Sequence, residues 1–184
     1  MYSGGMNQHF LQANPWRRFQ EGLGKTVFER SGNGWSFLAI LERTPFGKYL
    51  YLPYGPTFAD KESFLEALKE VRGLAAAQGA VFIRIEPTGG IDGSDLSQRG
   101  FRRIKEVNPE CTWVLDLTLP TEDLLSGMKQ NNRNLYKNHG KKGLSVHSTS
   151  EPGSLACLTS LLAGVAAHNR FNTHSADYLR KQMT

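Results

Sequence analysis

A pair of opposite charges on a predicted strand is the first feature of this sequence with residue types suited to catalysis. Arg84 and Glu86 alternate with the apolar residues Ile83 and Ile85. Because alternate side chains of a β-strand point to the same face, Arg84 and Glu86 share one face and the isoleucines the other. A carboxylate beside a cation can accept a proton from an attacking amine. A simple ion pair is the commoner arrangement for two such charges, so both readings stay open at this point.

Two further segments combine aromatic rings with features suited to a ligand. In residues 16–19, WRRF, an aromatic ring can stack on a base while an arginine grips a phosphate with two hydrogen bonds. Alternatively, Trp16 and Phe19 form the buried face of a first helix and the arginines its exposed face. In residues 51–56, YLPYGP, the prolines and glycine predict a rigid extended turn. This turn either places Tyr54 at the rim of a pocket or is only a strand exit.

A stripe of basic residues occupies a predicted helix in the last third of the chain. Lys129, Arg133 and Lys137 recur every four residues, and Lys141 and Lys142 follow. Side chains four residues apart lie on the same helical face. Such a face can follow a phosphate backbone, and a solvated surface has the same pattern.

Composition narrows the class of protein. The 184 residues are 39% hydrophobic and 21% charged, with a formal net charge of +5 and a pI near 9.3, which favours polyanionic partners. No apolar run reaches the roughly 20 residues that cross a bilayer, and no secretory signal is present, so we expect a cytoplasmic protein. The cysteines Cys111 and Cys157 are far apart, and the histidines lack metal-binding spacing. We therefore expect neither a metal site nor a cofactor.

The order of predicted elements indicates an α+β fold. Hairpin residues separate three apolar runs between Val27 and Leu52, and Asp60 is placed to cap a helix that ends near Gly79. The remaining predicted elements are a strand over 81–86, a short helix near Leu96, strands over 112–117 and 144–148, and helices over 121–139, 154–168 and from 175.

Six segments in a fixed order carry a family resemblance. They are FLQANPWRRF, YLPYGP, VFIRIEP, QRGFRR, CTWVLDL and MKQNNRNLYKNHGKKGLSV, within residues 10–146. Together they resemble the Fem family of tRNA-dependent peptidoglycan aminoacyltransferases. The resemblance implies an acetyltransferase-like (GNAT-like) mixed sheet with flanking helices, present in two related domains. Residues 1–142 would form the first domain and residues 143–184 the start of the second.

The resemblance also implies an activity and its participants. Family members move an amino acid from aminoacyl-tRNA to the peptide stem of a UDP-linked or lipid-linked muropeptide precursor, without a cofactor. In this family a basic residue just after an early tryptophan binds precursor phosphates, which corresponds here to Arg18 beside Trp16. Glu86 corresponds to a proposed base for the attacking amine, although some relatives carry Asp, and Val81 replaces a pocket tyrosine of some members. Tyr54 and Arg84 would line the same substrate site.

The stripe of Lys129, Arg133, Lys137, Lys141 and Lys142 is predicted to bind the tRNA, and a peripheral contact with a membrane surface is a further expected partner. Two other functions stay open. One is an acyl-CoA-dependent N-acyltransferase of GNAT-like fold, although no Q/R-x-x-G-x-G/A loop is present. The other is a basic RNA-binding module without catalysis. Because residues 176–184 still read as helix, we expect a longer protein whose second domain completes the site.

Overall fold

The structure, a computed structural model, describes residues 9–109, 111 and 114–183 and contains two compact units. The first unit comprises the described residues up to Pro109 together with 177–182. The second unit comprises the described residues from Cys111 to Ala176 together with Met183. The candidate catalytic residues fall in the first unit and the basic stripe in the second.

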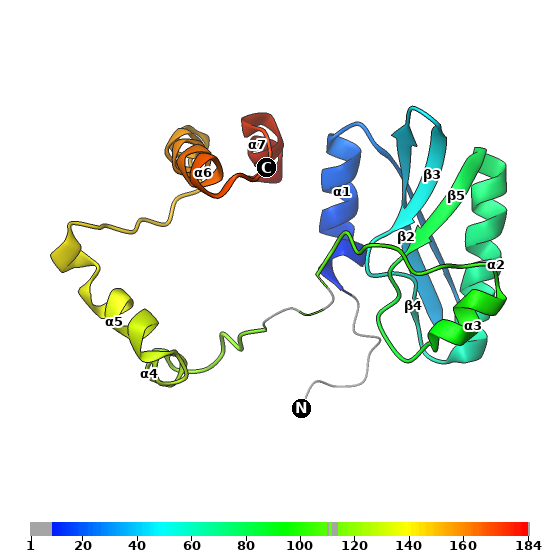
Figure 1. The fold of residues 1–184 in the computed structure, drawn as a ribbon, viewed down its shortest axis with the longest axis horizontal. Coiled ribbons are helices and arrows are strands. Elements are labelled where there is room, and N and C mark those ends of the chain that lie inside the picture. The colour runs from blue at the N-terminus through cyan, green and yellow to red at the C-terminus, as the bar shows by residue number, and fades with distance from the viewer. Residues whose placement is uncertain (1–8, 110, 112–113, 184) are drawn as a thin grey trace. The chain divides into compact units, whose positions relative to one another are not determined.

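The first unit is built on a five-stranded mixed sheet (Figure 1). Strands β1, β2 and β3 form the antiparallel meander expected from the hairpin residues, and β5 joins β3 in parallel. A short β4 pairs with the start of β2. The strands are β1 (Thr26–Gly32), β2 (Trp35–Thr44), β3 (Gly47–Leu52), β4 (Thr57–Phe58) and β5 (Ala80–Ile85).

Helix α2 (Lys61–Gln78) connects the meander to β5 and covers one face of the sheet. It begins as expected at Asp60, whose carboxylate accepts the Ser63 amide at 2.8 Å while Ser63 bonds back to the Asp60 amide. This reciprocal capping satisfies amides that have no partner inside the helix. The helix ends at Gly79, which has a φ of +64°. That left-handed conformation favours glycine.

The main core lies between α2 and the strands. Alternate residues of β2 point toward α2, and Leu50 and Leu52 of β3 are fully buried beside them. Each fully buried leucine contributes about 1.5 to 3 kcal/mol relative to an exposed one. The other residues of this core are Trp35, Phe37, Ala39, Leu41, Ala67, Val71 and Ala75.

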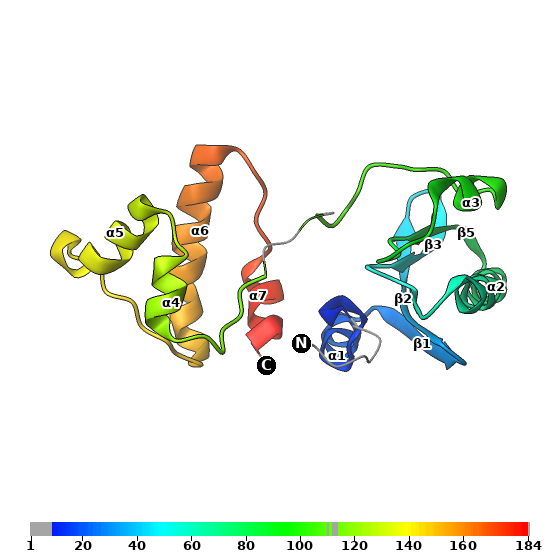
Figure 2. The same cartoon turned by 90° about the horizontal axis from the view of Figure 1, so that it is seen from below.

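Short helical elements lie on the opposite face of the sheet from α2 (Figure 2). They are the 3-10 turn η1 (Phe10–Gln12) and helix α1 (Asn14–Gly22). The buried Gln12 side chain bonds to the backbone N–H and C=O of Leu38 and to the carbonyl of Pro53. Gln12 therefore ties the start of the described chain to β2 and to the turn after β3.

After β5 the first unit contains helix α3 (Gly93–Gln98), close to the expected position, and an irregular segment to Pro109. Figure 1 shows this segment running back across the ends of β3 and β5. The terminal helix α7 (Ala176–Met183) places Tyr178 edge-on against Phe19, with ring centroids 5.0 Å apart.

The second unit is helical in its described residues. The predicted helix over 121–139 is wrong as a single element, because the chain forms α4 (Thr121–Ser126) and α5 (Gln130–Asn138) with Gly127 after α4. Helix α6 matches the helix expected from residue 154. The remaining elements are η2 (Gly140–Lys142), η3 (Pro152–Ser154) and α6 (Leu155–Asn169).

Two predicted strands are not observed. The prediction over 144–148 is wrong, because these residues are irregular and Leu144 and Val146 are exposed. The prediction over 112–117 falls partly outside the described residues, and residues 114–117 are irregular. A strand needs a hydrogen-bonding neighbour, and local alternation does not supply one. None of the described helices has the length and apolarity that crossing a membrane requires.

Candidate functional site

The structure gathers four polar side chains at the end of β5. The parallel register opposes Tyr51 of β3 to Arg84 of β5, and Glu86 follows directly after the strand. The fourth, Asn108, comes from the segment that runs back over the strand ends. The predicted pair Arg84 and Glu86 therefore has two further partners, Tyr51 and Asn108, that the sequence analysis did not identify.

Both oxygens of the Glu86 carboxylate are engaged. Oε2 accepts hydrogen bonds from the Tyr51 hydroxyl at 3.0 Å and from Asn108 Nδ2 at 2.7 Å. Oε1 accepts the Val107 backbone N–H at 3.3 Å and lies 3.9 Å from Arg84 Nε. The Glu86 side chain is 16% exposed, so the site holds a mostly buried, hydrogen-bonded carboxylate.

Arg84 balances this negative charge and reaches the returning segment. Its terminal nitrogen donates to the Lys105 carbonyl, and its guanidinium lies 5.9 Å from the centroid of the Tyr51 ring. Arg84 Nε is buried without a hydrogen-bond partner among the described residues. Both expected roles, ion pair and site residue, are thus compatible with its position.

The environment of Tyr51 favours its neutral form. Burial raises the pKa of the Tyr51 phenol well above its usual value, and the nearby Glu86 charge raises it further. Asn108 Nδ2 lies 2.6 Å from the Tyr51 oxygen and donates to it, while the hydroxyl proton goes to Glu86. Tyr51 is therefore a hydrogen-bond donor that fixes the position of the Glu86 carboxylate.

Tyr54 lies beside this group, although its conformation is not the extended turn that we expected. Its φ is +48°, an uncommon conformation for an aromatic residue. Its ring stacks on His9 with centroids 3.8 Å apart, and its hydroxyl donates to the Pro109 carbonyl at 2.7 Å. Burial lowers the pKa of the His9 imidazole. Glu86 N–H bonds to the carbonyls of Leu52 and Gly55, which brings the Tyr54 turn against β5.

The aromatic and basic residues of α1 are partly separated. Trp16 packs against Phe10 and Phe19, and its indole N–H is buried without a partner among the described residues. Arg17 pairs with Glu21 and Glu29. Arg18 is exposed and forms no ion pair with a described residue. Of the two arginines, Arg18 is therefore the one available to an anionic ligand.

The basic stripe divides into structural and exposed residues. Arg133 donates from one nitrogen to the carbonyls of Leu125 and Ser126, 3.3 and 3.2 Å away, at the end of α4. Lys129 precedes α5, and Lys137, Lys141 and Lys142 are exposed on α5 and η2. These four lysines can meet phosphates without breaking a side-chain hydrogen bond to another described residue, whereas Arg133 also joins α4 to α5.

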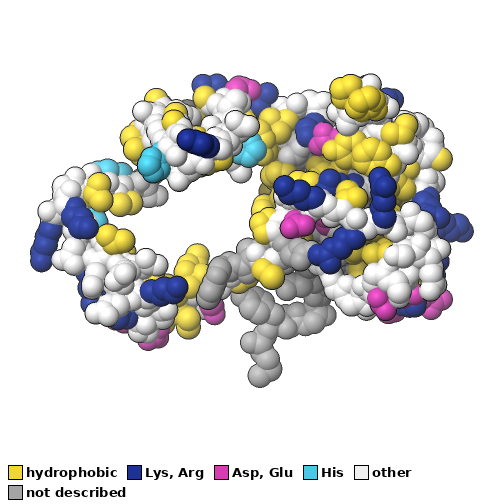
Figure 3. Space-filling view, in the orientation of Figure 1, with side chains coloured by type: hydrophobic (Ala, Val, Ile, Leu, Met, Phe, Trp, Pro, Cys, Tyr) yellow, Lys and Arg dark blue, Asp and Glu magenta, His cyan; other side chains and the backbone are white. Residues whose placement is uncertain are grey.

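Exposed apolar and basic side chains occur around the four-residue group. Phe82 stacks on Tyr49 with centroids 4.5 Å apart and is nearly half exposed. Figure 3 shows one face of the first unit, on which dark blue Lys and Arg side chains lie among uncovered yellow hydrophobic ones. Exposed residues near Arg84 and Glu86 are Val81, which lies on the same strand, and Lys105 and Val107, whose main chains contact Arg84 and Glu86.

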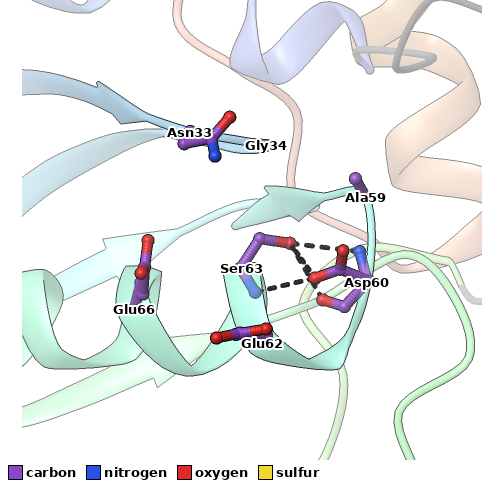
Figure 4. A pocket seen from close by; sticks show the side chains of 7 residues that line it. All are labelled: Asn33, Gly34, Ala59, Asp60, Glu62, Ser63 and Glu66. Carbon is purple, nitrogen blue, oxygen red and sulfur yellow. Dashed lines mark hydrogen bonds between the residues drawn. The ribbon is translucent and has the colours of Figure 1, made fainter.

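A pocket of about 320 Å³ lies elsewhere in the first unit, between the β1–β2 turn and the start of α2 (Figure 4). Figure 4 shows Asp60 and Ser63 bonded to each other at its edge. Its charged lining residues, Asp60, Glu62 and Glu66, are all acidic, and Glu66 accepts the Trp35 indole N–H. Asp60 lies at the pocket because it caps the start of α2, and the pocket contains none of the candidate site residues. Within the described residues, no cluster of His, Cys, Asp and Glu is suited to a metal ion.

No protein-family description matches the sequence, and no curated protein matches it. Among solved structures the chain is similar to the crystal structure of FemX, with a TM-score of 0.73 and 18% identity. The match covers 96% of this chain and 49% of FemX, so the chain spans about half the length of that protein. A probable acetyltransferase gives a TM-score of 0.36 at 10% identity, covering 55% of this chain and 75% of the other. The FemX match confirms the α+β fold and the fold-level resemblance to Fem proteins.

Proposed function

We propose that this chain belongs to an enzyme that transfers an amino acid from aminoacyl-tRNA to the peptide stem of a peptidoglycan precursor. The observation that carries the proposal is the match to FemX over 96% of the chain, in a sequence with six Fem-like segments in family order. The first unit would bind the acceptor. The described residues contain no element that favours the coenzyme A or purely RNA-binding alternatives over this function.

In the proposed reaction the acceptor amine attacks the ester carbonyl of aminoacyl-tRNA. An amide bond forms, the ester C–O bond breaks, and the terminal ribose hydroxyl of the tRNA leaves with a proton. The amine must lose a proton, and Glu86 is the candidate base. Tyr51 and Asn108 would then position Glu86 rather than react. An ester is already activated, so alignment of the two reactants supplies much of the rate.

The precursor phosphates are assigned to Arg18, with Trp16 beside it. Arg18 is exposed, and a guanidinium can grip phosphate oxygens with two charge-assisted hydrogen bonds. The indole N–H of Trp16 also lacks a partner among the described residues, but it is buried, so this assignment rests on Arg18. Arg84 and Tyr54 would contact the peptide part of the acceptor.

The tRNA is assigned to the second unit. Lys129, Lys137, Lys141 and Lys142 supply cations for its phosphates, and Arg133 adds a fifth charge while holding α4 against α5. The precursor can be soluble or membrane-bound, since both carry the same diphosphate and peptide stem.

Ligand binding measured by calorimetry tests the proposal on the chain itself. We expect a UDP-linked muropeptide to bind and to compete with UDP carrying the sugar alone. Acetyl coenzyme A should give no heat, because the chain lacks the pyrophosphate loop of acyl-CoA enzymes. Binding of acetyl coenzyme A in preference to the muropeptide would overturn the proposed function in favour of an N-acyltransferase.

A further inference from the structure

Three of the candidate site residues bind one short segment of their own chain, residues 105–109. They contact its main chain at every second residue. The contacts run from Arg84 to the Lys105 carbonyl, from the Val107 N–H to Glu86, and from the Tyr54 hydroxyl to the Pro109 carbonyl. These side chains come from β5, from the residue directly after it and from the turn after β3. Together these three side chains hydrogen-bond the main chain of one peptide segment.

Contacts of this kind do not depend on the side chains of the bound segment. A carbonyl, an N–H and a second carbonyl are present in any peptide, so another peptide can satisfy the same three groups. One contact is specific to this segment. Asn108 donates to Glu86 at 2.7 Å and to Tyr51 at 2.6 Å, and an unrelated peptide lacks that pair.

We propose that residues 105–109 are a built-in occupant of a peptide-binding groove, and that the acceptor's peptide stem replaces them on Arg84, Glu86 and Tyr54. We call residues 105–109 the latch. The proposal rests on the proposed function and adds a control step to it. While the latch is closed, both Glu86 oxygens accept hydrogen bonds, two of them from the latch, and the Glu86 side chain is 16% exposed, so the latch restricts the access of an amine to the carboxylate.

The latch has the properties of a segment that opens locally. It contains no helix or strand, and Val107 is 58% exposed. Segments with few buried apolar contacts open more readily than a packed core. If only a small fraction of molecules has the latch open, the apparent affinity for peptide is reduced in proportion to that fraction. A substitution that weakens the latch enlarges the fraction and so raises the apparent affinity.

Replacement of the specific contact tests the latch without any ligand. Asn108→Ala removes the two side-chain hydrogen bonds and leaves the three main-chain contacts. Hydrogen exchange at the Val107 amide should become about tenfold faster, the factor expected for the loss of roughly one net hydrogen bond. Cleavage after Glu106 by a glutamyl endopeptidase should accelerate by a similar factor. Asn131→Ala on the exposed face of α5 is the matched control and should change neither rate.

A second measurement tests the occupant. The probe is a synthetic five-residue peptide that contains a lysine with a free side-chain amine. We expect the peptide to accelerate cleavage after Glu106 in the unaltered chain, because it displaces the latch. Its affinity for Asn108→Ala should be about tenfold higher, because the open latch is about tenfold more populated in this variant.

The two proposals fail in different ways. If Asn108→Ala leaves the Val107 amide and the cleavage rate unchanged, the latch is wrong whatever binds. If the latch opens but the peptide protects residues 105–109, or binds both variants equally, the groove is not where the latch lies. If the peptide binds neither variant while the UDP-linked muropeptide still binds, the groove is wrong and the proposed function stands. Circular dichroism of Asn108→Ala must match the unaltered chain, and Asn108→Gln, which retains the amide, should restore part of the closure.

Discussion

At the scale of single residues, the Tyr51 phenol has the most strongly shifted pKa of the residues at the candidate site. It is partly buried, it donates to a carboxylate, and an amide donates to it. Burial and the hydrogen bond to Glu86 require the neutral phenol, and they outweigh the Asn108 hydrogen bond, which favours the phenolate. The residue therefore ties the stability of the first unit to a defined protonation state.

Tyr51→Phe should change how stability depends on alkaline pH. The folded-state pKa of Tyr51 is raised, whereas the unfolded phenol loses its proton near pH 10. Its contribution is therefore fully present below about pH 10 and is lost as pH rises toward the folded pKa. Denaturant unfolding between pH 8 and 11 should show a shallower loss for Tyr51→Phe than for the unaltered chain. Tyr136→Phe, at an exposed tyrosine, is the control. If the free energy of unfolding falls in parallel with pH for all three proteins, Tyr51 does not have the raised pKa described above.

Arg18→Ala should weaken binding of a UDP-linked muropeptide by about 1.5 to 3 kcal/mol, the range for a hydrogen bond to a charged group. The melting temperature should stay nearly unchanged, because Arg18 is exposed and has no ion pair with a described residue. Calorimetry with Arg43→Ala, which removes another exposed arginine of the first unit, provides the control. Equal affinity of Arg18→Ala and the unaltered chain would make Arg18 a surface residue only.

The sequence identified part of the site for a local reason. Alternation along one strand places Arg84 and Glu86 on one face, and this requires no knowledge of the rest of the fold. Tyr51 meets them only because β3 and β5 pair in parallel with a particular register, set by packing of the long α2 crossover. Asn108 arrives from an irregular segment that no periodicity predicts.

At the scale of elements, α5 combines two uses of its basic residues. Arg133 satisfies carbonyls at the end of α4, which lack partners within that helix. Lys137 of α5 and Lys141 of the following η2 contribute charge without such contacts among the described residues. A substitution that tests tRNA binding must therefore leave Arg133 in place.

The double variant Lys137→Ala with Lys141→Ala should reduce the salt dependence of tRNA binding. If four lysines meet phosphates, the slope of log affinity against log salt is about −3, and two lost contacts flatten it by roughly 1.5. Fluorescence anisotropy at 50 to 300 mM salt measures both slopes. Lys69→Ala on α2 is the control. A slope that does not change, or binding that is indifferent to salt, would remove the stripe from the tRNA contact.

The elements that the sequence predicted well carry their own boundary signals. Asp60 and Gly79 bound α2, and Asn33-Gly34 closes the first hairpin. The sequence predicts one helix over 121–139 because the apolar spacing continues past Gly127. In the structure the first helix, α4, ends at Ser126, and Gly127 caps it. Residues 144–148 alternate like a strand, but alternation records only which side chains share a face. Whether these residues form a strand depends on a hydrogen-bonding partner elsewhere in the chain, which the local pattern does not reveal.

At the scale of the whole molecule, the two units differ in how much apolar surface they bury. The first unit has a core of strand and α2 side chains, whereas in the described part of the second unit Leu155 is the single buried hydrophobic residue. On α6, Leu158, Leu161 and Val165 are each at least 47% exposed. Exposed apolar surface of this kind promotes association.

We expect the isolated chain to self-associate through α6. Leu161→Glu should lower the association measured by sedimentation velocity, because it places a charge on the apolar surface, while the neighbouring Ser160→Glu should not. Amide exchange should be slow over residues 26–85 and fast over residues 121–169. A monomer with uniformly slow exchange would show that the second unit is stable without additional cover.

The last prediction concerns activity. The match covers 49% of FemX. The proposed reaction needs the amine, the ester and the charge that develops between them to be aligned, and the role proposed for the first unit accounts only for the acceptor side. We therefore expect no detectable transfer of a labelled amino acid from aminoacyl-tRNA to a muropeptide by residues 1–184 alone, although the muropeptide binds. Addition of the remaining half of a FemX-like protein should restore transfer, and Arg18→Ala should reduce that restored rate through weaker acceptor binding. Robust turnover by a monodisperse preparation of residues 1–184 would instead show that this chain contains a complete site.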